Sequence, residues 1–341
     1  MIGAASGYTG LERAGLTGRG IVLAVVIIVS LVTTTPNGDA QTAAKKARVG
    51  ILGITPNNPV NVEMFKQGLA QLGYTDNQHV LFTDLDAKGD RARLSATAAD
   101  LVRTGAEVIF ARGPDSLAAA VRTTTTIPIV AIDLESDPVA LKYAKTLARP
   151  GGNVTGVFLD LPDLSAKQLQ LFREVVPDLT RVALVGDPRH NATQFRATER
   201  VAKVLGVQVQ TFAAHTAAEL DTALESARRI RAGAVLIFSS PLVFYNRERI
   251  AALAREKRVP SVSLFTEFAE AGGLLTYGPS LRDAFRRCGV YVGKILKGAK
   301  PGELPIEQPE TFELVLNMKT AKALGLKIPS SLQLRADRLI E

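Results

Sequence analysis

The chain has 341 residues, of which 46% are hydrophobic and 22% charged, a composition typical of globular proteins and unlike disordered or collagen-like chains. A single cysteine, Cys288, excludes an intrachain disulfide and a cysteine-based zinc site, and three scattered histidines argue against a histidine-built metal centre or a Ser–His triad. We therefore expect neither a metal site nor a cofactor. The net charge of +8 raises the question of a nucleic-acid partner.

The first forty residues have the features of a secretory signal peptide. Arg13 and Arg19 precede the apolar run Ile21–Val32, which is shorter than the about 20 helical residues that cross a bilayer. Small residues at the end of the following polar stretch predict cleavage after Ala40, so residues 1–40 would be removed. The alternative is an uncleaved N-terminal anchor. Because no cysteine lies near the cleavage point, we expect a periplasmic protein without a lipid anchor.

The remaining chain contains the same pattern twice. The apolar, β-branched runs Arg48–Gly53 and Arg181–Gly186 each predict a buried strand that ends at a glycine. The helix predicted after each strand also stops at a glycine, Gly73 in the first half and Gly206 in the second, at the same offset as the strands. This common offset indicates two copies of one structural unit.

Both halves continue as alternating strands and helices. In the first half the further elements are the helix Val62–Leu72, the strand Val80–Thr83, the helix Arg91–Thr104, the strand Glu107–Ala111, a third helix and the strand Ile127–Ala131. In the second half they are the helix Thr193–Leu205, the strand Val207–Phe212, the helix Ala217–Arg231, the strand Ala234–Phe238, a third helix and the strand Val259–Ser263. This alternation predicts the α/β class, with two similar Rossmann-like lobes whose parallel sheets carry helices on both faces.

The connections between the halves are apolar and rich in glycine. Ala148–Val157 and Glu270–Gly278 read as strands that pass between the lobes and form a multi-strand hinge, and the helix Leu281–Lys297 would return to the first lobe. Phe312–Leu316 and the short helix Lys319–Gly325 would make a last crossing. We expect residues 46–156 plus 279–309 in lobe 1, residues 157–278 plus 310–341 in lobe 2, and a ligand cleft between them.

Several segments together resemble one family. The matching segments are Arg48–Leu52, Phe65–Leu69, Leu72–Tyr74, Leu147–Gly156, Ala271–Pro279, Phe312–Asn317 and Lys319–Leu326. With these segments the chain is similar to the substrate-binding proteins of ABC transporters with the periplasmic binding protein type 1 fold, and most similar to their tryptophan/tyrosine-type subgroup. The resemblance implies capture of a small solute between two lobes and transient delivery to an ABC permease in the inner membrane. We expect a monomer.

Candidate ligand-binding residues follow the strands, because ligands of parallel α/β sheets bind beyond the carboxyl ends of the strands and pockets form between domains. The relevant loops are Ile54–Asn57, Arg112–Ser116, Asp133–Pro138, Asp187–Asn191, Ser239–Phe244 and Phe265–Phe268, together with the crossover at Tyr277. From these we select Thr55, Pro56, Gly113, Pro114, Asp115, Ser116, Asp133, Asp137, Asn191, Pro241, Phe244, Phe265, Glu267 and Tyr277.

Each of the strongest candidates has a purely structural alternative. Asp115 or Ser116 could bind a carboxylate or hydroxyl at a helix start, or could only cap its own helix. Asp133 or Asp137 could hold an amino group, although Asp137 before a proline is also a typical N-cap. Tyr277 could stack on a solute or belong to the core.

Other functions fit the sequence less well. No phosphate-binding glycine motif stands between a strand and a helix, so we expect no enzyme activity. Cys288 lies in a helical pattern and is expected to pack as a small apolar residue. The basic residues are scattered, which argues against nucleic-acid binding. Two alternatives stay open: a periplasmic ligand sensor for a receptor kinase, and a nucleobase-like or other polar ligand in place of an amino acid or aromatic carboxylate.

Overall fold

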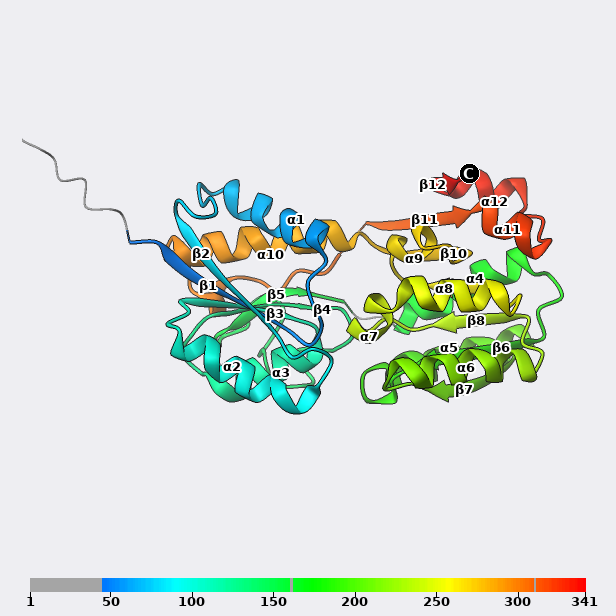
Figure 1. Ribbon diagram of the computed structural model, residues 1–341, viewed down its shortest axis with the longest axis horizontal. Helices are drawn as coiled ribbons and strands as arrows, with labels where there is room; N and C mark the ends of the chain where they lie inside the picture. The colour runs from blue at the N-terminus through cyan, green and yellow to red at the C-terminus, as the bar shows by residue number, and fades with distance from the viewer. Residues whose placement is uncertain (1–44, 160–161, 310) are drawn as a thin grey trace, which may run out of the picture. The chain divides into compact units, whose positions relative to one another are not determined.

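The computed structural model describes residues 45–341, with the exception of residues 160, 161 and 310 (Figure 1). The segment Ala44–Glu341 forms one compact unit, which contains two α/β lobes. The predicted signal peptide, residues 1–40, lies outside the described residues, so its cleavage stays a prediction.

The first lobe is built on a five-stranded parallel sheet with the order β2-β1-β3-β4-β5. Its strands are β1 (Ala47–Gly53), β2 (Val80–Asp86), β3 (Val108–Arg112), β4 (Ile129–Asp133) and β5 (Val154–Phe158). Its helices are α1 (Pro59–Ala70), the 3-10 turn η1 (Arg91–Arg93), α2 (Leu94–Arg103), α3 (Pro114–Thr123), α10 (Leu281–Leu296) and the 3-10 turn η2 (Pro301–Glu303).

Both faces of this sheet are covered, because successive residues of a strand point to opposite faces. On β3, Phe110 packs into the core shared with α1 and α10, where its ring stacks on Phe65 at 4.3 Å and meets the edge of Phe285 at 5.5 Å. Its neighbour Ile109 packs into the core on the other face, together with Leu117 of α3. The continuous apolar runs in the sequence are therefore the signature of strands buried on both faces.

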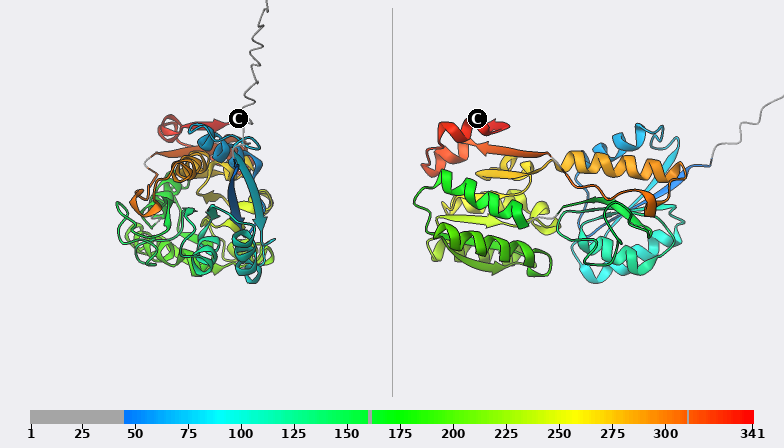
Figure 2. Two further views of the ribbon diagram at one scale, coloured as in Figure 1. Left: turned by 90° about the vertical axis from the view of Figure 1, so that its left-hand side faces the viewer. Right: turned by 180° about the vertical axis from the view of Figure 1, so that it is seen from behind.

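Helix α10 lies beside α1, although more than two hundred residues separate them in the chain (Figures 1 and 2). Glycines bring the two backbones close together. A Cβ atom at Gly68 would lie 1.9 Å from the carbonyl oxygen of Arg286, and one at Gly289 would lie 2.0 Å from that of Phe65. The predicted return of the helix at Leu281 to the first lobe is thus confirmed.

The second lobe has a seven-stranded sheet with the order β12-β11-β10-β9-β8-β6-β7. Its strands are β6 (Arg181–Gly186), β7 (Gln208–Ala213), β8 (Ala234–Ile237), β9 (Ser261–Ser263), β10 (Leu275–Pro279), β11 (Phe312–Asn317) and β12 (Arg338–Ile340). Its helices are α4 (Pro162–Val175), α5 (Pro188–Leu205), α6 (Ala217–Arg229), α7 (Pro241–Tyr245), α8 (Arg247–Glu256), α9 (Thr266–Glu270), α11 (Met318–Leu324) and α12 (Ser330–Arg335).

The predicted doubling is confirmed by the strand orders, because β2-β1-β3-β4 in the first sheet corresponds to β7-β6-β8-β9 in the second. Other features differ from the prediction. Helices α4, α9 and α12 and strand β12 have no counterpart among the predicted elements, and the third helix of the second half is two helices, α7 and α8, that meet at Asn246. The bounds of the lobes stay a prediction; β5 ends at Phe158 and β10 at Pro279, one or two residues beyond those expected.

The alternation of strands and helices predicts a wholly parallel sheet in the second lobe. This prediction is wrong for one pair of strands. Strand β11 runs antiparallel to β10, with Pro279 opposite Phe312. The reason is the path of the chain. Strand β10 leaves the second sheet toward the first lobe and β11 re-enters from that side, so the two strands must run in opposite directions.

Candidate functional site

A cavity of about 470 Å³ lies where the carboxyl ends of strands from both lobes face each other. The first lobe contributes residues that follow β1, β3 and β4, and the second lobe contributes residues that follow β8 and β9. The residues that line the cavity include Thr55, Pro56, Asn57, Asn61, Arg112, Gly113, Glu135, Ser239, Ser240, Pro241, Phe244, Arg247, Glu248, Phe265 and Phe285. This position is the one expected for a ligand of parallel α/β lobes.

Aromatic side chains form the apolar part of the cavity. The ring of Phe244 on α7 meets that of Phe265 edge to face at 6.0 Å between centroids, and Phe285 of α10 joins them from the first lobe. The guanidinium of Arg247 lies 4.9 Å from the centroid of the Phe244 ring. These rings offer faces and edges on which a planar or cationic group of a ligand can pack.

Arg112, the last residue of β3, supports the first-lobe side of the cavity. Its Nη2 donates a hydrogen bond of 2.8 Å to the carbonyl oxygen of Thr55. The guanidinium occupies the place of a missing side chain, since a Cβ atom at Gly53 would lie 1.8 Å from Nη2. Burial lowers the pKa of Arg112 to about 10, against the opposing charges of Asp84 and Asp86. Arg112 is therefore a cation at neutral pH.

A hydrogen bond crosses between the lobes inside the cavity. The hydroxyl of Ser239, which follows β8, donates to Oε1 of Glu135, which follows β4, at 3.0 Å. Burial raises the pKa of Glu135, and the charge of the neighbouring Asp133 raises it further. Burial likewise raises the pKa of Asp133. A buried carboxylate, Asp133, thus lies close to a half-buried one, Glu135, that faces the cavity.

The lobes also approach each other closely at Gly113, where α3 begins. The backbone of Gly113 has a φ of +81°, and a Cβ atom there would lie 2.9 Å from Cγ of Pro241, the first residue of α7. Only glycine adopts this backbone conformation readily and also leaves room for the proline. Gly113 therefore permits the contact that closes one side of the cavity.

The structure brings together a part of the predicted site. The predicted residues that line the cavity are Thr55, Pro56, Gly113, Pro241, Phe244 and Phe265. The remaining candidates lie outside its lining; they are Pro114, Asp115, Ser116, Asp133, Asp137, Asn191, Glu267 and Tyr277.

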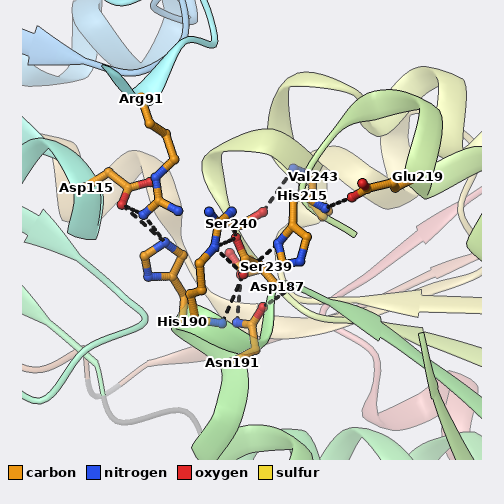
Figure 3. Close-up of polar contacts among 11 residues, drawn as sticks. Arg91, Asp115, Asp187, His190, Asn191, His215, Glu219, Ser239, Ser240 and Val243 are labelled. Carbon is orange, nitrogen blue, oxygen red and sulfur yellow. Dashed lines mark hydrogen bonds and ion pairs between the residues drawn. The ribbon is translucent and has the colours of Figure 1, made fainter. Parts of the chain in front are cut away.

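Asp115 belongs to a polar cluster beside the cavity (Figure 3). Its carboxylate is hydrogen-bonded to Arg91 and lies 3.3 Å from Nε2 of His190, which is on α5 of the second lobe. In the same cluster Asp187 caps α5 through the N–H of Arg189 and pairs with His215 at 3.1 Å. Asp115 is therefore part of a contact between the lobes.

Asp133 and Asp137 each hold a turn by accepting hydrogen bonds from backbone N–H groups. Oδ1 of the buried Asp133 accepts hydrogen bonds from the N–H groups of Glu135 and Ser136, each at 3.1 Å. Oδ1 of Asp137 accepts from the N–H groups of Val139 and Ala140. Asp137 therefore binds backbone N–H groups as an N-cap would, but no helix lies between β4 and β5 in the described chain, so the helix start considered at Asp137 is wrong.

Asn191 and Ser116 are buried behind the cavity. The Asn191 side chain donates to the carbonyl oxygen of Ser239 at 3.1 Å and accepts from the N–H of Asp187, so it holds the loop that carries Ser239. Ser116 and Pro114 are buried within α3, and the hydroxyl of Ser116 has no hydrogen-bond partner among the described residues.

Tyr277 and Glu267 lie toward the hinge. The half-buried ring of Tyr277 stacks on Phe312 with 6.0 Å between centroids and touches the cores of both lobes, while Gln168 donates to its carbonyl oxygen at 2.7 Å. The carboxylate of Glu267 is buried and lies 3.9 Å from Arg282. Tyr277 is thus a packing residue of the hinge.

Sequence reasoning did not select the charged residues that do line the cavity, among them Arg112, Glu135 and Arg247. Arg112 and Glu135 lie in the loops expected after β3 and β4, whereas Arg247 begins α8 and lies beyond the expected loop Ser239–Phe244. A charged residue at the end of a buried apolar strand, such as Arg112, could have indicated these positions. Burial of a charge without a partner is costly, so such a residue is expected to have a partner or to face a ligand.

The structure also bears on other site types. Cys288 is fully buried in the core and donates to the carbonyl oxygen of Ala131 at 3.6 Å, so it packs as the sequence predicted. Across residues 45–341, apart from the three not described, no group of three or more His, Cys, Asp or Glu side chains is placed to hold a metal ion. Over the same residues no helix has the length and apolar character to cross a membrane.

Comparison with known proteins places these features in a family. The tyrosine-binding protein of Clostridioides difficile (strain R20291) is 22% identical over 325 residues, which cover 90% of this chain and 92% of that protein. A Streptococcus pneumoniae ABC domain solved in complex with L-tryptophan is 24% identical, with a TM-score of 0.78 over 86% of this chain and all of that one. A conserved domain protein from Vibrio cholerae O1 biovar El Tor has the same identity, TM-score and coverage.

The solved structures show that the fold is that of the type 1 periplasmic binding proteins, as the sequence predicted. The family model described as ABC transporter substrate binding protein matches residues 56–340. Proteins of that family bind substrates without transforming them and are typically extracytoplasmic. The chain belongs to the family of ABC transporter substrate-binding proteins.

Proposed function

We propose that the protein is the periplasmic solute-binding component of an ABC importer, and that it captures a small solute by closure of its two lobes. The solute is an amino acid or an aromatic carboxylate. The loaded protein acts as a monomer and delivers the solute to a permease in the inner membrane by a transient contact. The single observation that carries this proposal is the cavity of about 470 Å³ lined by both lobes.

The size and lining of the cavity support the ligand class. An apolar cavity of about 150 Å³ holds one benzene molecule, so this one has room for an aromatic ring with polar substituents. Phe244, Phe265 and Phe285 would contact the ring, and Arg112 is a cation beside the cavity that suits a carboxylate. The relatives described as tyrosine-binding and as a complex with L-tryptophan support the same class.

The mechanism follows from the contacts between the lobes. A ligand that touches residues of both lobes binds the closed form more tightly than the open form, so it shifts the population toward closure. The Gly113–Pro241 approach and the Glu135–Ser239 hydrogen bond already join the lobes in the structure, and a ligand in contact with both lobes would hold them in this form. The permease would then recognise the paired surfaces of the closed lobes.

A thermal-shift screen of the purified protein against amino acids and aromatic acids tests the proposal. A true ligand at about 100 times its Kd should stabilise the protein by about 2.7 kcal/mol and raise the unfolding midpoint by several degrees. Small-angle scattering at saturation should then show a smaller radius of gyration than the free protein has. A panel that leaves the midpoint unchanged would overturn the ligand class, and saturation without compaction would overturn the closure mechanism.

A further inference from the structure

We propose that the solute carries a cationic amine and that the carboxylate of Glu135 binds this amine inside the cavity. The inference rests on the proposed function and deepens it. It distinguishes between the two ligand classes named above, since an amino acid has an ammonium group and a simple aromatic carboxylate has none.

The first argument is the balance of charge in the cavity. Its charged lining residues are Arg112, Glu135, Arg247 and Glu248. Arg247 pairs with Glu248 at 3.4 Å, and Arg112 is balanced by the two carboxylates at the end of β2. The groups that act on Glu135 are the carboxylate of Asp133, the hydroxyl of Ser239 and the backbone of Leu134, and none of these is basic. Glu135 is thus the charged lining residue that a ligand cation can balance.

The second argument is the cost of leaving Glu135 as it is. A buried carboxylate beside a second carboxylate is disfavoured unless a cation or several donors compensate it. Glu135 has the Ser239 hydroxyl at 3.0 Å, and the neighbouring Asp133 has one carboxylate oxygen with no hydrogen-bond partner among residues 45–341 as described. Burial and the charge of Asp133 raise the pKa of Glu135. This raised pKa indicates that no cation of the protein compensates the Glu135 carboxylate.

The third argument is the set of acceptors around the cavity. The side-chain oxygens of Asn57 and Asn61 are buried and have no hydrogen-bond partner within the part of the chain that the structure describes, and both residues line the cavity. The amide nitrogen of Asn57 donates to Asp84, which fixes its oxygen as the free atom. An ammonium group offers three donors and no acceptor, so it suits a cavity in which unpaired acceptors are available.

The aromatic residues complete the ligand's description. Phe244, Phe265 and Phe285 provide an apolar wall, and Ser239 places Glu135 at the boundary between the lobes. An amine bound there would replace the Ser239 hydroxyl as a partner of Glu135 or share the carboxylate with it. The ligand class is therefore an aromatic or large apolar amine, in which an additional carboxylate can face Arg112.

The experiment compares matched ligands by isothermal titration calorimetry. The probes are L-tryptophan, tryptamine and indole-3-propionate, and the corresponding set with a phenol ring, which are L-tyrosine, tyramine and 3-(4-hydroxyphenyl)propionate. We expect the amine-bearing probes to bind at least about tenfold more tightly than the acid that lacks the amine, the loss expected when a charged hydrogen bond is removed. Equal or tighter binding of the acids without the amine would overturn the inference and leave the proposed function intact. No binding by any probe would overturn both.

Variants test the role of Glu135 itself. Glu135→Gln is expected to weaken the amine-bearing probes by about tenfold or more and to leave the acids without the amine within about threefold. Glu225→Gln is the matched control, because Glu225 is paired with Lys257 at 2.7 Å and lies outside the lining of the cavity. Equal losses for both probe classes in Glu135→Gln would mean that this residue only supports the fold, and would overturn its assignment.

Proton release provides a test on the unmodified protein. Because the pKa of Glu135 is raised in the free protein, binding of a cation should expel its proton, and the affinity for amines should rise from about pH 6 to about pH 8. The other titratable groups nearby are Asp133 and, against Asp133, His190, so the titration is repeated in His190→Gln. Calorimetry in two buffers of different ionisation enthalpy should show release of up to about one proton per ligand. Proton uptake, or no proton exchange with tightly bound amines, would overturn the inference.

Discussion

Nε2 of His190 on α5 lies 3.3 Å from the carboxylate of Asp115 at the start of α3, so a side chain of the second lobe meets one of the first lobe beside the cavity. Nη2 of Arg91 lies 3.2 Å from the same imidazole nitrogen. Because a guanidinium can only donate, this contact requires Nε2 to be the acceptor, and neutral His190 then carries its proton on Nδ1. These three side chains connect the lobes independently of any ligand (Figure 3).

Loss of this contact should weaken ligand capture. Asp115→Asn is expected to reduce ligand affinity by about threefold to tenfold, because Asp115 holds the Arg91 guanidinium that donates to His190 of the second lobe, and weakening this partly buried interaction costs about 0.5–1.5 kcal/mol. Asp100→Asn is the control, since Asp100 forms an exposed ion pair with Arg103 within the first lobe. Titration calorimetry measures both; equal affinities in the two variants would show that the Asp115 contact does not contribute to closure.

The pH dependence of stability should have a component from His190. Burial lowers the pKa of this imidazole in the folded protein. Below about pH 6.5 the unfolded chain therefore binds more protons than the folded one, and the stability present above that pH is lost as the pH falls. The raised pKa values of Asp133 and Glu135 act in the opposite direction, since they favour the folded state at low pH.

The component is isolated as the difference in free energy of unfolding between the unmodified protein and His190→Gln. We expect this difference to decrease from about pH 7.5 to about pH 5.5, measured by urea unfolding at several pH values. A difference that is constant or grows on acidification would contradict a lowered pKa at His190.

Gly113→Ala should affect both stability and binding. A non-glycine residue at a φ of +81° costs about 1–2 kcal/mol, and the new methyl group would collide with Pro241 across the cavity. Gly73→Ala is a matched control, because Gly73 has a similar φ of +89° but open space around it. Both variants should lose similar stability in thermal unfolding, whereas only Gly113→Ala should lose ligand affinity.

Phe110→Ala should alter the cavity by removing a ring that packs against Phe285 in its wall. The ring of Phe110 is buried against Phe65 and Phe285, and truncation of such a ring costs about 3–5 kcal/mol. Because Phe285 lines the cavity, its altered support should also weaken ligand binding. Phe172→Ala in the core of the second lobe serves as the control, with a comparable loss of stability in denaturant and an unchanged affinity at low temperature. Parallel losses of affinity in both would contradict a local effect through Phe285.

The architecture could be predicted because it depends on patterns along the chain. Strands buried on both faces leave continuous apolar runs, and the glycines Gly73 and Gly206 mark equivalent ends of the first helix in each lobe. Strand β12 could not be found in this way, since Arg338–Ile340 is a short and largely exposed edge strand without such a run. Helix α4 lies between the two copies of the repeated unit, so the repeat in the sequence does not predict it.

The cavity was predictable by its loops but not by its side chains. Arg112 and Asp115 both follow the buried part of β3, and only the missing side chain of Gly53 directs the guanidinium to the cavity. The pairing of Glu135 with Ser239 joins residues 104 positions apart on different lobes, so it depends on how the lobes meet. Sequence patterns within one lobe carry no information about such a contact.

The position of α10 has a consequence for the way in which this chain folds. The first lobe's core needs Phe285 and Val292, which come from a helix near the end of the chain and pack against α1 near its beginning. A chain that emerges N-terminus first cannot complete this lobe before Leu281–Leu296 has emerged, whereas most of the second lobe is by then available. Contacts between such distant segments slow folding, so the first lobe should complete its core later than most of the second.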